Sequence, residues 1–154
     1  MIFTILNKIK FLIQILFMLL TISCTRNVNK FERKEELLRY LTNIQRLNIT
    51  DKSFDLYIIQ VLKCGKCTET FLKYLSENAP KKSIIIFSNN YTNSIVDVLK
   101  TKPNIILMYD VDFQLSKYGL STADDLFVRF ENGKITKSRF IDNETVNNLD
   151  KIIN

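Results

Sequence analysis

Short apolar runs alternate along the chain with segments whose apolar residues recur every three or four positions. The runs have the length and the β-branched or aromatic content of strands, and they cover 55–62, 83–88, 104–109, 126–130 and 134–141. Helical spacing of apolar residues predicts helices over 68–78, 91–100, 113–118 and 144–153, and an amphipathic helix over 27–47. The pattern therefore predicts alternating strands and helices in one domain.

The order of these elements predicts an α/β fold. Strands that alternate with helices imply parallel pairing through right-handed crossovers. The Asn132-Gly133 dipeptide is the strongest hairpin signal in the chain, and it joins the last two runs as antiparallel neighbours. We expect a mixed, mostly parallel sheet with a C-terminal antiparallel hairpin, helices on both faces and an N-terminal helix before the sheet.

The first residues have the layout of a secretory signal peptide. Two lysines, Lys8 and Lys10, precede a short apolar run from Phe11 to Ile22. The following Ser23-Cys24 resembles the bacterial lipobox, in which the cysteine is lipidated and becomes the mature N-terminus. The alternative is an ordinary signal peptide or an uncleaved membrane anchor with an incidental cysteine.

This interpretation divides the chain into three parts. Residues 1–23 form the lipoprotein-type signal peptide, 24–53 the lipidated N-terminus, linker and amphipathic helix, and 54–154 the α/β domain. It also predicts a bacterial cell-envelope protein held to the membrane through Cys24 and facing the periplasm or the cell exterior.

Charge and composition exclude several function classes. The chain has 22 basic and 16 acidic residues, and its charges alternate in sign rather than forming a basic stripe, so we expect no nucleic-acid partner. It has no histidine, which removes imidazole-ligated zinc sites and histidine-dependent nucleophiles and bases.

The stretch VLKCGKC, residues 61–67, holds the candidate chemistry. A strand that runs into Cys-x-x-Cys and then a helix places Cys64 at the helix N-terminus, where unpaired N–H groups favour a thiolate. Cys67 follows about one turn later and is placed to resolve a mixed disulfide. Lys63 and Lys66 add positive charge beside the thiols, and Gly65 permits close approach of a partner backbone.

Other uses of the pair stay open at this point. A structural disulfide between Cys64 and Cys67 would close a very small loop and add little stability. Zinc needs four ligands, and this chain has neither histidine nor a second cysteine pair. Two thiolates alone are enough for Cu(I). Lipidation of Cys24 would account for the odd cysteine, and export would place the pair where disulfides persist.

The chain resembles the thioredoxin-like superfamily, especially the membrane-tethered TlpA/ResA-like thiol-disulfide oxidoreductases. The resemblance spans 54–154 and rests on the strand-CGKC-helix unit, the added strand and helix from Ser83 to Lys100, and the segments MYDVDFQLSKYGL and FVRFENGKI. It implies a thioredoxin-like fold that exchanges disulfides, without a cofactor or metal, with exported proteins that carry cysteine pairs.

Two positions depart from the family pattern. Lys63 stands where the family has tryptophan, and Asp124 or Asp125 falls where it has a cis-proline facing the cysteines; no proline follows Pro103. Because cis peptides are essentially confined to proline, we expect residues 121–125 to run trans or in an unusual bend. Carboxylates near a thiolate raise its pKa, so these aspartates would oppose the lysines.

The leading hypothesis is an envelope-anchored thiol-disulfide oxidoreductase in which Cys64 attacks and Cys67 resolves. The alternative is a non-catalytic thioredoxin-fold lipoprotein that binds a partner protein or Cu(I) through the same face, since fold alone does not decide between them.

Overall fold

A five-stranded mixed sheet forms the centre of the computed structural model, which describes residues 31–61, 65–78, 82–142 and 144–153. The strand order is β3-β2-β1-β4-β5. The three parallel strands are β1 (Phe54–Ile59), β2 (Ser83–Phe87) and β3 (Ile105–Tyr109), and β4 (Asp125–Glu131) and β5 (Lys134–Ile141) run antiparallel. The expected α/β class is confirmed.

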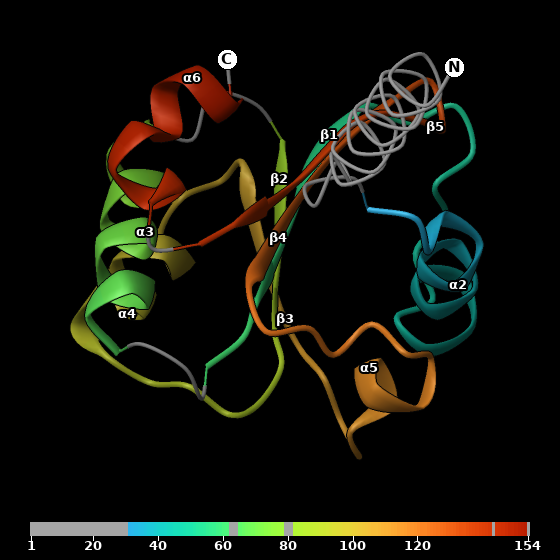
Figure 1. The fold of residues 1–154 in the computed structure, drawn as a ribbon, viewed down its shortest axis with the longest axis horizontal. Helices are drawn as coiled ribbons and strands as arrows, with labels where there is room; N and C mark the ends of the chain where they lie inside the picture. Colours follow the sequence, from blue (N-terminus) through green and yellow to red (C-terminus); the bar gives the residue numbers. More distant parts are fainter. Residues whose placement is uncertain (1–30, 62–64, 79–81, 143, 154) are drawn as a thin grey trace, which may run out of the picture.

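Helices cover both faces of the sheet (Figure 1). On the left in that view lie α3 (Gly65–Asn78), α4 (Ser94–Lys100) and α6 (Leu149–Ile153), the last preceded by a 3-10 turn, η2 (Thr145–Asn148). On the right lie α2 (Lys34–Arg39), which continues as a π-helical turn, η1 (Tyr40–Ile44), and α5 (Gln114–Lys117). The cysteine helix α3 and α5 therefore cover opposite faces.

Each face of the sheet has its own hydrophobic core, because alternate residues of a strand point to opposite sides. On β1, Tyr57 and Ile59 pack under α3, α4 and α6, whereas Leu56 and Ile58 pack under α2, η1 and α5. All six residues of β1 are buried. The central strand is thus held between two cores, which fixes its register.

The hairpin signal is confirmed in detail. Glu131 pairs with Lys134, and the two residues between them have positive φ, 50° at Asn132 and 74° at Gly133. Two consecutive left-handed residues define the turn that matches the twist of a hairpin, and Asn-Gly adopts it readily. The tip also docks on the preceding loop, because Gly133 N–H donates to Lys52 O at 2.9 Å.

Side chains end strand β1 earlier than its apolar run predicts. The sequence predicts a strand to residue 62, but β1 stops at Ile59. The next two N–H groups leave the sheet ladder: Gln60 N donates to Asp125 Oδ1 at 2.7 Å, and Val61 N donates to Ser88 Oγ at 3.2 Å. Both donors stay satisfied while the chain turns away from the sheet.

The remaining elements lie close to their expected positions, with shifts that capping explains. Helix α4 begins at Ser94 rather than 91, because the side chain of Asn93 accepts from Val96 N at 2.9 Å. The expected 144–153 helix is instead the 3-10 turn η2 followed by the short helix α6, and the N-cap residue of η2 is Glu144 rather than Asp142 or Asn143. The carboxylate of Asp142 accepts from Thr145 N at 2.8 Å at the start of this segment. The described part of the expected 27–47 helix contains α2 and η1.

The segment that replaces the expected cis-proline loop has trans peptide bonds. Every peptide bond among the described residues is trans, including those through 121–125. No helix in the described part of the chain is long and apolar enough to cross a membrane, and the expected signal peptide and Cys24 lie outside that part.

A buried ion pair links β1, β4 and the C-terminal helix. Arg129 donates to the carboxylate of Asp55 at 2.8 and 3.0 Å, and the same guanidinium donates to Ile153 O at 2.6 Å. Asp55 is 1% exposed. The carboxylate raises the pKa of Arg129, so the guanidinium stays charged throughout the working pH range.

Removal of either partner should cost about 3 kcal/mol of unfolding free energy, because a buried charge is left uncompensated. We expect this loss in Asp55→Val and in Arg129→Met, measured by denaturant unfolding. The double variant should recover much of it, since both charges are then absent. Losses that simply add in the double variant would show that the pair is not coupled.

Candidate functional site

Helix α3 presents its first turn at the surface. Gly65, the first residue of the helix, and Lys66 are exposed, and Cys67 is half-buried. A Cβ atom placed on Gly65 would meet no other described atom within 4 Å. The described atoms therefore leave space beside Gly65 at the start of α3.

Aromatic packing fixes α3 against the sheet. The ring of Tyr57 packs edge-on against Phe71 of α3, with centroids 5.7 Å apart, and stacks on Phe127 of β4 at 5.4 Å. Phe71 and Leu72 are fully buried. The central strand, the cysteine helix and β4 thus form one packed unit, so the first turn of α3 has a defined place at the carboxyl end of β1.

Three of the expected site residues lie outside the described residues: Cys24, Lys63 and Cys64. What the structure describes is the chain on both sides of Cys64. It leaves the sheet after β1 and enters α3 at Gly65, with Cys67 in the first turn. The strand-to-helix setting expected for the motif is present.

The two aspartates at the family's proline position have different environments. Asp125 is the first residue of β4 and is buried, and its carboxylate holds the N–H of Gln60. Asp124 is half-buried, and its carbonyl accepts from Thr122 Oγ1 at 2.7 Å. The structure therefore brings Asp125 to Gln60, the first residue after β1, which is four residues before Cys64. A charged acceptor makes this hydrogen bond stronger than a neutral one would.

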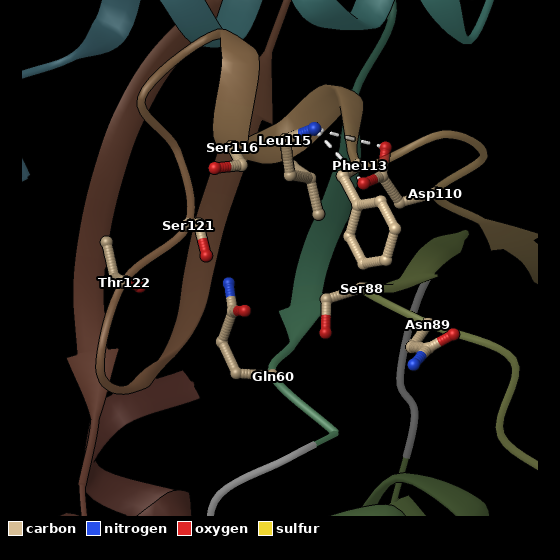
Figure 2. A pocket seen from close by; sticks show the side chains of 9 residues that line it. All are labelled: Gln60, Ser88, Asn89, Asp110, Phe113, Leu115, Ser116, Ser121 and Thr122. Atoms are coloured by element: carbon tan, nitrogen blue, oxygen red, sulfur yellow. Dashed lines mark hydrogen bonds between the residues drawn. The ribbon is translucent and has the colours of Figure 1, made fainter.

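A cavity of about 160 Å³ lies at the carboxyl ends of the three parallel strands, on the face covered by α5 (Figure 2). Its wall includes Gln60 after β1, Ser88 after β2 and Asp110 after β3, and Ser121 and Phe113 close it from the α5 side. In α/β sheets this end of the strands is where ligands usually bind.

The amide of Gln60 points into this cavity (Figure 2). Gln60 is only 6% exposed, and its Nε2 atom has no hydrogen-bond acceptor among the described residues. Leaving a buried donor unpaired costs about 1–3 kcal/mol. The chain therefore retains an unfavourable polar group at this position.

Asp110 anchors one wall of the cavity. Its carboxylate accepts from Leu115 N at 3.1 Å and from Tyr40 Oη at 3.0 Å, and Gln45 Nε2 in turn donates to Tyr40 Oη at 2.7 Å. Burial raises the pKa of Asp110 above its ordinary 3.8, and this outweighs the lowering by the hydrogen bonds from Leu115 and Tyr40. The network joins the N-terminal helical segment to the wall.

Phe113 stands at the rim of the cavity in an unusual conformation. It precedes α5 with φ 55° and is 68% exposed, and its neighbour Asp112 has φ 59°. Left-handed backbone is unfavourable for a residue with a bulky side chain. The loop from β3 to α5 therefore holds an exposed aromatic ring beside the cavity at some cost in backbone strain.

Gln60, Asp110 and Phe113 were not among the site residues predicted from the sequence. The sequence could have indicated Gln60 and Asp110, because each is a polar residue directly after an apolar strand. Residues at this position lie together at the carboxyl ends of parallel strands. No comparable signal marks Phe113, since its exposure depends on the positive φ of the loop.

The described residues contain no group of three or more cysteine, aspartate or glutamate side chains arranged to hold a metal ion. The fold and the site together define an α/β protein with a five-stranded mixed sheet and a Cys-x-x-Cys stretch between its central strand and the following helix. Comparison with protein-family models, curated proteins and solved structures found no match to this chain.

Asp125→Asn should make Cys64 more reactive. The asparagine keeps an oxygen for Gln60 N but removes a negative charge four residues before Cys64 in the chain, so the alkylation midpoint of Cys64 should move to lower pH. The measurement is the pH dependence of Cys64 alkylation in a Cys67→Ser background. Glu131→Gln, at the far end of β4, is the matched control and should change nothing. An unchanged alkylation midpoint in Asp125→Asn would contradict the role given to this carboxylate.

The contribution of protonated Asp110 to the free energy of unfolding should be lost as the pH rises. Because its pKa is raised, the native state binds this proton more tightly than the unfolded chain, so stability is lost from pH 3.8 up to the native pKa. Unfolding free energies of the wild type and Asp110→Asn, measured from about pH 3 to about pH 7, give the contribution of this group. The wild-type value minus the variant value should fall with rising pH; a difference that rises with pH would contradict the assignment.

Proposed function

We propose that this chain is a thioredoxin-like thiol-disulfide oxidoreductase of the bacterial envelope. The proposal is supported chiefly by one observation: the Cys-x-x-Cys stretch lies between the buried central strand β1 and α3, with Cys67 half-buried in the exposed first turn of the helix. The mixed sheet with its C-terminal hairpin and two layers of helices is compatible with a thioredoxin-like fold.

The N-terminus of helix α3 explains why Cys64 attacks and Cys67 resolves. Unpaired N–H groups and the positive end of the helix dipole stabilise a thiolate at the N-terminus of α3, directly after Cys64. Lys66 is exposed beside it and adds positive charge. Cys64 is therefore the attacking thiol, and Cys67 is the resolving thiol.

In the proposed exchange, every disulfide bond that breaks is replaced by one that forms, and the electrons pass between this chain and its partner. The Cys64 thiolate attacks one sulfur of a partner disulfide, a Cys64–partner disulfide forms, and the other partner sulfur leaves as a thiolate. The Cys67 thiolate then attacks the Cys64 sulfur and releases the partner's second thiolate. The partner is reduced by two electrons and the pair becomes a disulfide, which a second envelope dithiol must reduce again. The reverse sequence oxidises a partner dithiol.

The proposed location follows from the first residues of the sequence. A lipidated Cys24 would anchor the domain to the membrane, because lipoprotein cysteines carry more than one acyl chain. The partners would then be exported proteins with cysteine pairs. This compartment permits both oxidised and reduced states of the Cys64–Cys67 pair.

A second candidate is a non-catalytic module that binds a partner protein or Cu(I) through the same thiols. The observation that favours it is the carboxylate of Asp125 beside the end of β1, since negative charge opposes a reactive thiolate. Two thiolates without further ligands suit Cu(I).

Cys67→Ser should trap mixed disulfides, because Cys64 can still attack but the resolving thiol is absent. We expect adducts that disappear on reduction when the variant is expressed in a bacterial envelope and run on non-reducing gels. Mass spectrometry should identify exported proteins as the captured partners.

Two controls make this experiment decisive. Cys64→Ser should trap far less, because Cys67 lies within the helix and is half-buried, and Cys64→Ser/Cys67→Ser should trap nothing. Equal capture by the two single variants would contradict the assigned roles. No capture by either would leave the binding module as the better account, and cytosolic partners alone would refute the envelope location.

A further inference from the structure

Gln60, which lines the cavity, directly precedes the cysteine motif in the sequence. The cavity nevertheless lies on the face of the sheet covered by α5, opposite the face covered by the cysteine helix α3 (Figure 1). Gln60 is four residues before Cys64, and its N–H is held by Asp125 of β4. The next residue, Val61, is held by Ser88 Oγ, which also lines the cavity. A molecule bound here would therefore contact the segment that leads into the motif.

Gln60 supplies a hydrogen-bond donor that the described protein does not use. Its Nε2 atom is buried without an acceptor, and its amide extends between Ser121 and Ser88 (Figure 2). The hydroxyl of Ser88 already accepts a hydrogen bond from Val61, so its own proton can point to a ligand. The cavity thus offers donors to an oxygen atom of a bound molecule.

The negative charge of Asp110 in the cavity wall favours a ligand whose oxygen atom is uncharged. The carboxylate of Asp110 lines the cavity, and Tyr40 and Leu115 hold it in place. A bound carboxylate would be repelled by Asp110, whereas an amide carbonyl would not. A neutral amide can also donate through its N–H groups to the oxygen atoms of the wall.

The dimensions of the cavity favour part of a peptide over a free cofactor. A volume of about 160 Å³ is small for a cofactor site, which typically exceeds 300 Å³. A second hollow of about 290 Å³ adjoins it and shares Ser88, Asp110 and Phe113. Phe113 and Val111 are exposed at its edge. An extended chain could place one amide in the first hollow and an apolar neighbour on these side chains.

We propose that this cavity binds a neutral amide in an extended segment of the partner protein, and that Gln60 Nε2 donates to its carbonyl oxygen. The assignment of the partner as a disulfide-exchange substrate rests on the proposed function; the amide site itself does not. The amide belongs either to the partner's backbone or to an asparagine or glutamine side chain.

Amide binding can be measured without any redox chemistry. The full chain carrying Cys64→Ser/Cys67→Ser, kept in detergent, is titrated with three probes while the side-chain amide resonances of Gln60 are followed by NMR. The probes are the N-acetyl N-methylamides of asparagine, aspartate and glycine. The asparagine probe should shift the Gln60 resonances saturably, and the aspartate probe, ionised at neutral pH, should bind about tenfold more weakly.

Gln60→Met tests the donor itself, because methionine has a similar volume and no N–H group. This variant should fold at least as stably as the parent, since it removes an unpaired buried donor, but it should bind the asparagine probe about tenfold more weakly, seen through the backbone signals of Ser88 and Ser121. Gln114→Met, a matched change outside the cavity, should bind like the parent.

Each outcome decides one part of the proposal. Glycine binding equal to asparagine binding assigns the site to backbone amides, and weaker glycine binding assigns it to side-chain amides. The absence of saturable shifts, full binding by Gln60→Met, or aspartate binding as tight as asparagine binding when glycine binds more weakly than both would overturn the site. Amide binding without trapped adducts in Cys67→Ser would retain the site and reject the oxidoreductase.

Discussion

The end of strand β1 is the constraint on which the site depends. Two backbone N–H groups that would continue the ladder are instead satisfied by side chains, Gln60 N by Asp125 and Val61 N by Ser88. An unpaired buried N–H would be costly, so these two acceptors allow a fully buried strand to stop within the core. The chain then turns out of the sheet, and Cys67 is presented in the first turn of α3. The acceptor of the first of these bonds is a carboxylate, so the strand ends beside an acidic side chain.

Residues at the carboxyl end of β1 contribute to the packing under α3 on one face of the sheet and to the cavity under α5 on the other. Tyr57 joins α3 and β4 on one face, whereas Gln60 opens into the cavity under α5 on the other. The cavity wall continues through Asp110 to Tyr40 and Gln45, so the N-terminal helical segment is connected to it by buried hydrogen bonds. A partner segment in the cavity and a thiol pair at α3 would thus be held by one short stretch of chain.

The strands and the middle helices were predictable from the sequence to within a few residues, but the first turn of the expected 144–153 helix is a 3-10 turn instead. Apolar periodicity places every strand, and Asn132-Gly133 determines the hairpin because both residues adopt positive φ. The end of β1 was not predictable, since Val61 is apolar and only the tertiary contact with Ser88 removes it from the ladder. The sequence also located the thiol motif and the unusual acidic position. The unpaired amide of Gln60 and the exposed ring of Phe113 depend on how the loop before α5 packs over the end of the sheet, which no local sequence pattern indicates.

The central claim is that strand β1 and helix α3 hold Cys64 and Cys67 as a reversible redox pair. Equilibration of the wild-type chain with thiol-disulfide buffers of graded potential, followed by alkylation and mass spectrometry, tests it most directly. The account predicts a single two-electron transition between the dithiol and a Cys64–Cys67 disulfide, with the same midpoint approached from either side. A pair that never forms the disulfide, or one that no buffer reduces, would contradict it.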